Sequence, residues 1–139
     1  MVCIGKPSRL RLSIESGDRV GIIHSARALT IKDDNGCHIW SRELRKGYPV
    51  YRYRSQGRSV SVSVHRIVLE ARLGYELDSN ACHHRCGKSA CINPDHLQLV
   101  TNADNNAEML ARKYYVSRIR ELEHALSVVS PEHCLLRAA

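Results

Sequence analysis

The sequence predicts an α+β fold in which a small antiparallel sheet precedes a metal-binding segment and a long C-terminal helix. Three observations indicate this order. Residues 47–64 alternate between apolar and polar side chains, as a β-hairpin does. Residues 82–96 concentrate cysteine and histidine, and the apolar residues that follow Thr101 recur at helical spacing. The chain shows no internal repeat and no low-complexity linker.

Composition favours one small domain with an unusual source of stability. The 139 residues include no Phe and one Trp, so we expect a structural metal or a partner subunit to supplement apolar burial. The formal net charge of +7 and the pI of about 9.3 indicate a polyanionic partner. Nucleic acid is the first candidate and an anionic membrane surface the second.

The cysteines are expected to bind metal. No apolar run approaches the ~20 residues of a membrane span, and the N-terminus lacks the pattern of a secretory signal. We therefore expect an intracellular, reducing compartment, where six cysteines indicate metal ligation and not disulfides.

The first 40 residues are less clearly patterned. Residues 9–14 (RLRLSI) alternate polar and apolar side chains, which predicts an edge strand before a turn at residues 16–18. Residues 19–32 are ambiguous. Residues 33–36 (DDNG) predict a turn that leads into a short strand over 37–40.

The hairpin predicted over residues 47–64 turns at residues 55–57 and separates two kinds of side chain. Tyr51 and Tyr53 share one face, whereas Arg52 and Arg54 share the other, with Arg58 near the tip. A two-stranded ribbon can read guanine in the DNA major groove through arginine, or track phosphates. The alternative is an ordinary solvated face.

Helical spacing follows the hairpin and returns at the C-terminus. A helix is predicted over residues 63–73, ending at Gly74, and a short strand over 96–100. Residues 101–104 resemble a capping box that starts a helix reaching about Val128. This helix carries an apolar stripe that is either packed core or a homodimer seam, namely Tyr115, Ile119, Leu122, Leu126 and Val129.

The metal-binding segment supplies three ligands with regular spacing. Four residues separate Cys86 from Cys91, and four more separate Cys91 from His96. Thiolate and imidazole ligands together select zinc, and a structural zinc needs a fourth ligand. That ligand is either the nearby Cys82 or the distant Cys37.

The segment also resembles the His-Cys box of zinc-containing HNH endonucleases (His-Me finger, or ββα-metal, nucleases), as in homing and phage endonucleases. The matching pattern is H-x-C-x4-C-x-N-P-x-H-L-x7-N, from His84 to Asn105. The motifs G-C-x-x-W at residues 36–40 and H-R at residues 65–66 also match. The resemblance implies an N-terminal extension over 1–35, a nuclease domain over 36–110 and a C-terminal helical tail over 111–139.

The resemblance assigns roles to these residues. It implies a structural zinc held by Cys37, Cys86, Cys91 and His96, and it favours Cys37 over Cys82. It implies hydrolysis of double-stranded DNA with His84 as general base and with a catalytic Mg²⁺ bound by Asn105.

Several neighbouring residues keep two interpretations. Arg85 either contacts a phosphate or is solvated, and His65, at a helix start, is interpreted as structural. The rival interpretation of the whole chain is a zinc-stabilised DNA-binding protein without cleavage activity.

Overall fold

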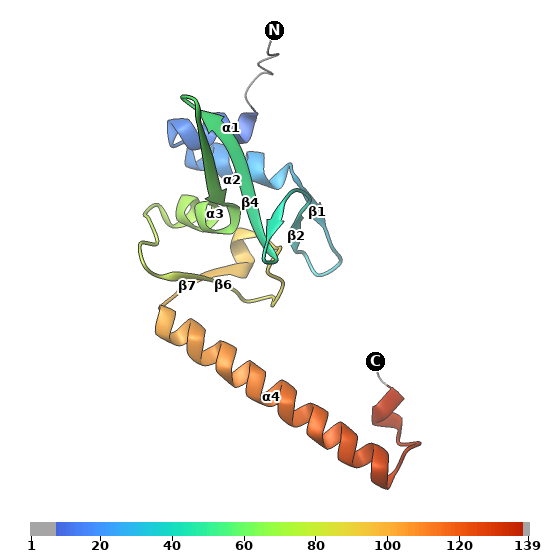
Figure 1. The fold of residues 1–139 in the computed structure, drawn as a ribbon. Coiled ribbons are helices and arrows are strands. Elements are labelled where there is room, and N and C mark those ends of the chain that lie inside the picture. The colour runs from blue at the N-terminus through green and yellow to red at the C-terminus, as the bar shows by residue number, and fades with distance from the viewer. Residues whose placement is uncertain (1–7, 138–139) are drawn as a thin grey trace. The chain divides into compact units, whose positions relative to one another are not determined.

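The computed structural model describes residues 8–137 and divides into two compact units, one ending at Val100 and the other beginning at Thr101 (Figure 1). The three-part division over 1–35, 36–110 and 111–139 stays a prediction. The first unit combines three helices with three small antiparallel sheets, which confirms the α+β class.

The elements of the first unit are, in chain order, α1 (Arg9–Ser16), α2 (Arg19–Arg27), β1 (Thr30–Lys32), β2 (His38–Trp40), β3 (Leu44–Arg45), β4 (Tyr48–Ser55), β5 (Arg58–Ser63), α3 (Val64–Leu73), β6 (Ala81–His84), the 3₁₀ turn η1 (Pro94–His96) and β7 (Leu97–Val100). The second unit contains α4 (Asn102–Val129) and the 3₁₀ turn η2 (Cys134–Arg137).

The edge strand predicted over residues 9–14 is wrong, because this segment forms α1. Ser8 caps the helix, and its hydroxyl accepts a hydrogen bond from the Arg11 backbone N–H at 3.2 Å. Leu10 and Ile14, four residues apart, share one helical face toward the core, whereas Leu12 is half exposed. Gly17 ends the helix in the left-handed conformation, with φ of 70°.

The ambiguous segment 19–32 contains α2 and β1. The Asp18 side chain caps α2 by accepting a hydrogen bond from the Gly21 backbone N–H at 3.0 Å. A Cβ at Gly21 would lie 2.2 Å from the Asp18 carboxylate, so this cap needs a glycine there. After the predicted turn, β2 pairs antiparallel with β1, with Ile31 opposite Ile39.

The predicted hairpin is confirmed as β4 paired with β5, and Figure 1 shows it beside α1 and α2. Gln56 and Gly57 both have positive φ, as a tight two-residue hairpin turn requires. The chain then enters α3, which ends at Gly74 as predicted.

The metal-binding segment lies between β6 and β7, which pair antiparallel with His84 opposite Leu97. The main core of the first unit is formed by α1, α2 and α3 together with β2, β7 and adjoining loops. Its buried members are Leu10, Ile22, Ala26, Trp40, Val64, Val68, Leu69, Leu77, Ile92 and Leu97.

In the second unit, the predicted cap is confirmed: the Thr101 hydroxyl accepts a hydrogen bond from the Asp104 backbone N–H at 3.1 Å. None of the described α4 residues is buried, and Ile119 and Leu122 are more than half exposed. Within its own unit the apolar stripe is therefore largely exposed, and the packed-core and homodimer-seam interpretations both stay predictions. Among residues 8–137, no helix combines the length and apolar character that a bilayer span requires.

Candidate active site and metal centre

Cys37 and three side chains of residues 86–96 converge in the first unit. Cys37 precedes β2, Cys86 and Cys91 lie in the loop after β6, and His96 ends η1. Their ligand atoms all lie within 4.8 Å of one another. This metal cluster contains Cys37 and not Cys82, and the role of its members as zinc ligands stays a prediction.

The spacing within the metal cluster suits tetrahedral zinc. The Nδ1 atom of His96 is 3.5 Å from Cys37 Sγ and 3.7 Å from Cys91 Sγ. Zinc bonds of about 2.3 Å to sulfur and 2.0 Å to nitrogen place tetrahedral ligands about 3.6 Å apart. The two distances from His96 therefore suit a tetrahedral zinc held by these residues.

Hydrogen bonds fix the two segments that carry the cluster. The Asp33 carboxylate accepts bonds from the backbone N–H groups of Asn35 and Cys37, at 3.0 and 2.8 Å. Asn93 donates its side-chain N–H to the Gly36 carbonyl at 2.8 Å and thereby ties the metal loop to the turn before β2. The cluster consequently has a preformed support.

The electrostatics of the cluster call for a cation. Burial, reinforced by the neighbouring thiols of Cys86 and Cys91, raises the pKa of Cys37 to about 12. Burial also raises the pKa of Cys91. Three thiols gathered in a partly buried site do not ionise together unless a cation offsets their charge, and a bound zinc would supply that charge.

Cys82 has a different environment. Its thiol donates a long hydrogen bond, 3.7 Å, to the backbone carbonyl of His65, and burial raises its pKa to about 12. This cysteine therefore joins β6 to α3 as a packed thiol.

His84 lies at the end of β6 and is 8% exposed. Burial lowers its pKa, and a hydrogen bond to the backbone of Cys91 opposes part of that shift. The ring is consequently neutral near pH 7. Its Nε2 atom is buried and has no hydrogen-bond partner among the described residues. A neutral imidazole with an unpaired nitrogen can accept a proton.

Two further rings surround His84. The His65 ring centroid lies 5.1 Å from that of His84, and the Tyr48 centroid lies 5.4 Å from His65 and 6.0 Å from His84. The sequence interpretation of His65 was structural, and Tyr48 was given no role. The available signals were the H-R dipeptide at the start of α3 and the Gly47-Tyr48 pair at the start of β4, which both match the family resemblance.

Asn105 belongs to the second unit. It lies in the first turn of α4, where its backbone N–H donates to the Thr101 carbonyl at 3.0 Å. Its amide oxygen is a ligand type that Mg²⁺ accepts. The role of Asn105 stays a prediction.

The candidate DNA-contacting arginines lie on open surface. Arg52, Arg54, Arg58 and Arg85 are all exposed. The opposite face of the hairpin is half-buried: the Tyr51 and Tyr53 rings stack with centroids 5.6 Å apart, and Arg11 of α1 lies 5.8 Å from the Tyr53 ring. The predicted division into a packed face and an open face is therefore confirmed, whereas DNA contact stays a prediction.

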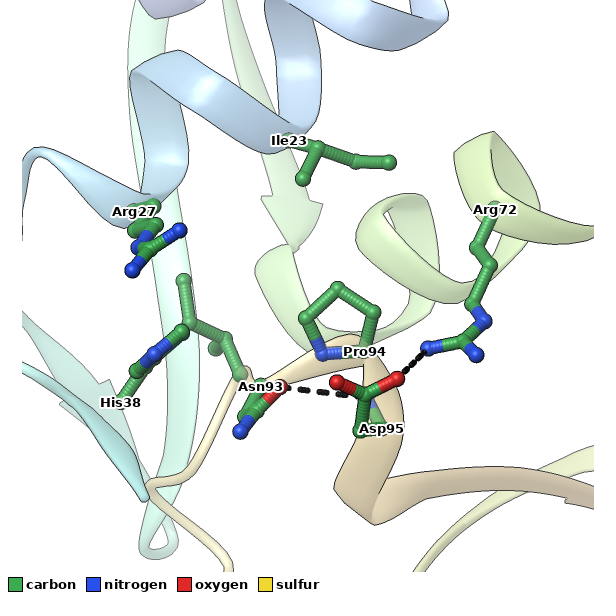
Figure 2. Close-up of a pocket in the computed structure, with 8 residues that line it drawn as sticks. Ile23, Arg27, His38, Arg72, Asn93, Pro94 and Asp95 are labelled. Atoms are coloured by element: carbon green, nitrogen blue, oxygen red, sulfur yellow. Dashed lines mark hydrogen bonds and ion pairs between the residues drawn. The ribbon is translucent and has the colours of Figure 1, made fainter. Parts of the chain in front are cut away.

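A cavity of about 370 Å³ borders the metal loop (Figure 2). Figure 2 shows Arg27 and His38 on one side and the Arg72–Asp95 ion pair on the other. Neither imidazole of the His65–His84 pair lines this cavity, so it is separate from the candidate base.

The comparison with protein families identifies the same region. Residues 62–107 match a family model described as HNH endonuclease, over about a third of the chain. The matched segment includes His65, His84 and Asn105, together with three members of the metal cluster. The chain matches no curated protein and no solved structure. The resemblance read from the His-Cys box is thus supported at the level of the family: residues 62–107 are similar to HNH endonucleases.

Proposed function

We propose that this chain is an endonuclease that hydrolyses phosphodiester bonds of double-stranded DNA, with His84 as general base, one Mg²⁺ and a structural zinc. One observation carries the proposal. A buried, neutral imidazole with an unpartnered Nε2 ends the strand that leads directly into the metal cluster, within the HNH endonuclease match.

The reaction requires a deprotonated water. His84 accepts the proton of a water through Nε2, and the resulting hydroxide attacks phosphorus, forming one P–O bond while the bond to the 3′ oxygen breaks. The bond to the Cys91 backbone holds the ring and favours the protonated state that follows. When bound at Asn105, Mg²⁺ would offset negative charge on the phosphate and on the leaving oxygen.

Zinc has a structural role in this proposal. Cys37, Cys86, Cys91 and His96 would together supply the four ligands of a structural zinc. The metal cluster fixes the loop next to His84. An intracellular, reducing compartment keeps these thiols available as ligands.

DNA binding is assigned to the exposed arginines of the hairpin and to Arg85. The chain's charge of +7 attracts the phosphate backbone. Arg54 and Arg58 lie on the open face and at the tip of the hairpin, whereas Arg52 forms an ion pair with Glu43 at 3.1 Å. A two-stranded ribbon of this kind fits the major groove.

The test is cleavage of supercoiled plasmid by the wild type, His84→Ala and Asn105→Ala, with zinc quantified in each sample. We expect His84→Ala to lower the rate by about 10²–10⁴-fold and Asn105→Ala to raise the Mg²⁺ concentration needed. His83→Ala, at the adjacent imidazole, is the matched control and should retain activity. Cleavage by His84→Ala at the wild-type rate would refute the base assignment.

The second candidate is a zinc-stabilised DNA-binding protein without cleavage activity. The observation in its favour is that the Nε2 atom of His84 is covered by protein, and a general base must reach a water. Plasmid binding without cutting in Mg²⁺, Mn²⁺ and Ca²⁺ would support this candidate.

The apolar stripe of α4 is proposed as a homodimer seam. Its residues recur at alternating intervals of four and three, and Tyr115, Ile119 and Leu122 are 63%, 53% and 54% exposed. Two copies would place two active sites on one DNA and permit cleavage of both strands. Sedimentation should show a concentration-dependent dimer that Leu122→Glu abolishes. A wild-type protein that stays monomeric at all concentrations would exclude the seam.

A further inference from the structure

Three buried side-chain nitrogens in the described part of the chain lack a hydrogen-bond partner: Trp40 Nε1, His65 Nδ1 and His84 Nε2. An unpaired buried polar group costs about 1–3 kcal/mol and is uncommon in folded proteins. Two of the three belong to adjacent rings, because the centroids of His65 and His84 lie 5.1 Å apart. These two rings, which we call the imidazole pair, therefore place two unpartnered buried nitrogens in one region of the first unit.

The position of the His65 ring is fixed by three elements. His65 lies in the first turn of α3, and its backbone carbonyl accepts the thiol of Cys82, which belongs to the same strand as His84. Tyr48, at the start of β4, contacts both imidazoles. The two rings consequently hold a set spacing, which a shared ligand requires.

A packing role explains this arrangement poorly. His65 is 7% exposed, and an apolar side chain of similar size would fill the same space without an unpaired nitrogen. Its pKa is lowered to about 4, first by burial and then by His84 and Arg66, so the ring is neutral at pH 7. A neutral ring can form a hydrogen bond at Nδ1 without competing for the proton that His84 accepts.

We propose that His65 is a second catalytic residue, whose Nδ1 forms a hydrogen bond to the water that His84 deprotonates. This inference rests on the proposed function. The water loses one proton to His84 Nε2, its oxygen forms the new bond to phosphorus, and His65 neither gains nor loses a proton. One water with two hydrogen bonds of about 2.8 Å joins nitrogens up to about 5.6 Å apart, which the ring spacing permits.

Three substitutions at one position test the proposal, because they differ in where they offer a polar atom. The amide of His65→Asn lies near the position of Nδ1, the amide of His65→Gln lies nearer that of Nε2, and His65→Leu offers none. We expect His65→Leu and His65→Gln to lower the cleavage rate at saturating DNA by about 10–100-fold. His65→Asn should restore most of that rate, while zinc content and the DNA concentration for half-maximal rate stay unchanged in all three.

The possible outcomes separate this inference from the proposed function. Wild-type cleavage by His65→Leu, or equal loss in His65→Asn and His65→Gln, overturns the role of His65 and leaves His84 as base. A wild-type protein that cuts no DNA, or His84→Ala that cuts normally, overturns both. If the variants lose zinc, the ¹⁵N NMR signals of the His65 ring in the wild type test the proposal instead. A hydrogen-bonded Nδ1 supports the proposal, and an Nδ1 without a hydrogen bond overturns it.

Discussion

The metal cluster and the imidazole pair are neighbours that differ in how their polar atoms are partnered. In the metal cluster, four ligand atoms lie within 4.8 Å of one another, and hydrogen bonds support the segments that carry them. In the imidazole pair, two buried ring nitrogens have no partner. Converging and supported groups make a rigid structural element, whereas unmet hydrogen-bonding capacity indicates where a ligand acts.

The two regions are also mechanically joined. His84 precedes Cys86 by two residues, its carbonyl accepts the Gly87 backbone N–H at 3.0 Å, and its ring bonds to the backbone of Cys91. The Arg85 backbone N–H donates to the His96 carbonyl at 2.8 Å. The metal loop therefore helps to hold the His84 ring in place, although the metal cluster and the imidazole pair have different chemical tasks.

The largest expected effect comes from breaking the metal cluster. Cys91→Ala should lose zinc and unfold, because structural zinc contributes on the order of 10 kcal/mol to the free energy of folding. Cys82→Ala is the matched control, and it should keep zinc and cost about 1–2 kcal/mol. Zinc quantification and chemical unfolding check both. A folded, zinc-loaded Cys91→Ala would contradict the assignment of this cysteine as a ligand.

Acid should destabilise the protein through the imidazole pair. The folded-state pKa of His65 is about 4, below the ordinary value of 6.5. Between these values the unfolded chain binds a proton that the folded protein does not, so the free energy of unfolding decreases as the pH falls from about 6.5 to about 4. The full effect is about 3 kcal/mol, with about 2 kcal/mol reached at pH 5.

Comparison of wild type with His65→Asn isolates this effect. Both proteins release zinc in acid, and this loss cancels when the two proteins are compared in excess zinc. The free energy of unfolding is measured with urea at pH 7.5 and at pH 5. The difference between the two proteins in the change of this free energy is then due to residue 65. The stability of His65→Asn should fall less on acidification than that of the wild type. Identical losses in the two proteins would mean that the His65 ring gains its proton at the ordinary pKa in the folded state.

The sequence allowed the local features to be predicted, because short-range chemistry determines them. The hairpin turn needs Gly57, the α4 cap needs Thr101, and the His-Cys box encodes its own spacing. The α1 helix was missed because residues 9–14 satisfy the period of a strand as well as that of a helix. Burial of Leu10 in the core decides between them, and burial depends on the whole fold.

The imidazole pair could not be predicted from the sequence for a related reason. Nothing in the local sequence states that position 65 lies beside position 84, because α3 and β6 meet only through tertiary packing. The sequence likewise could not predict whether the α4 stripe packs within one chain or against a second copy, because the same apolar pattern suits both.

The smallest expected effect concerns the hairpin, where DNA binding should separate from chemistry. Arg54→Ala and Arg58→Ala should each weaken DNA affinity and reduce the dependence of log K on log salt by about 1, because each removes one phosphate contact. Arg52→Ala is the internal control: Glu43 already pairs with this guanidinium, so we expect a smaller change. Titrations of DNA binding at several salt concentrations check this order, and the cleavage rate at saturating DNA should stay at the wild-type value in all three. A lower saturated rate in Arg54→Ala would mean that the hairpin acts on the imidazole pair as well as on the DNA backbone, and the separation between binding surface and active site would fail.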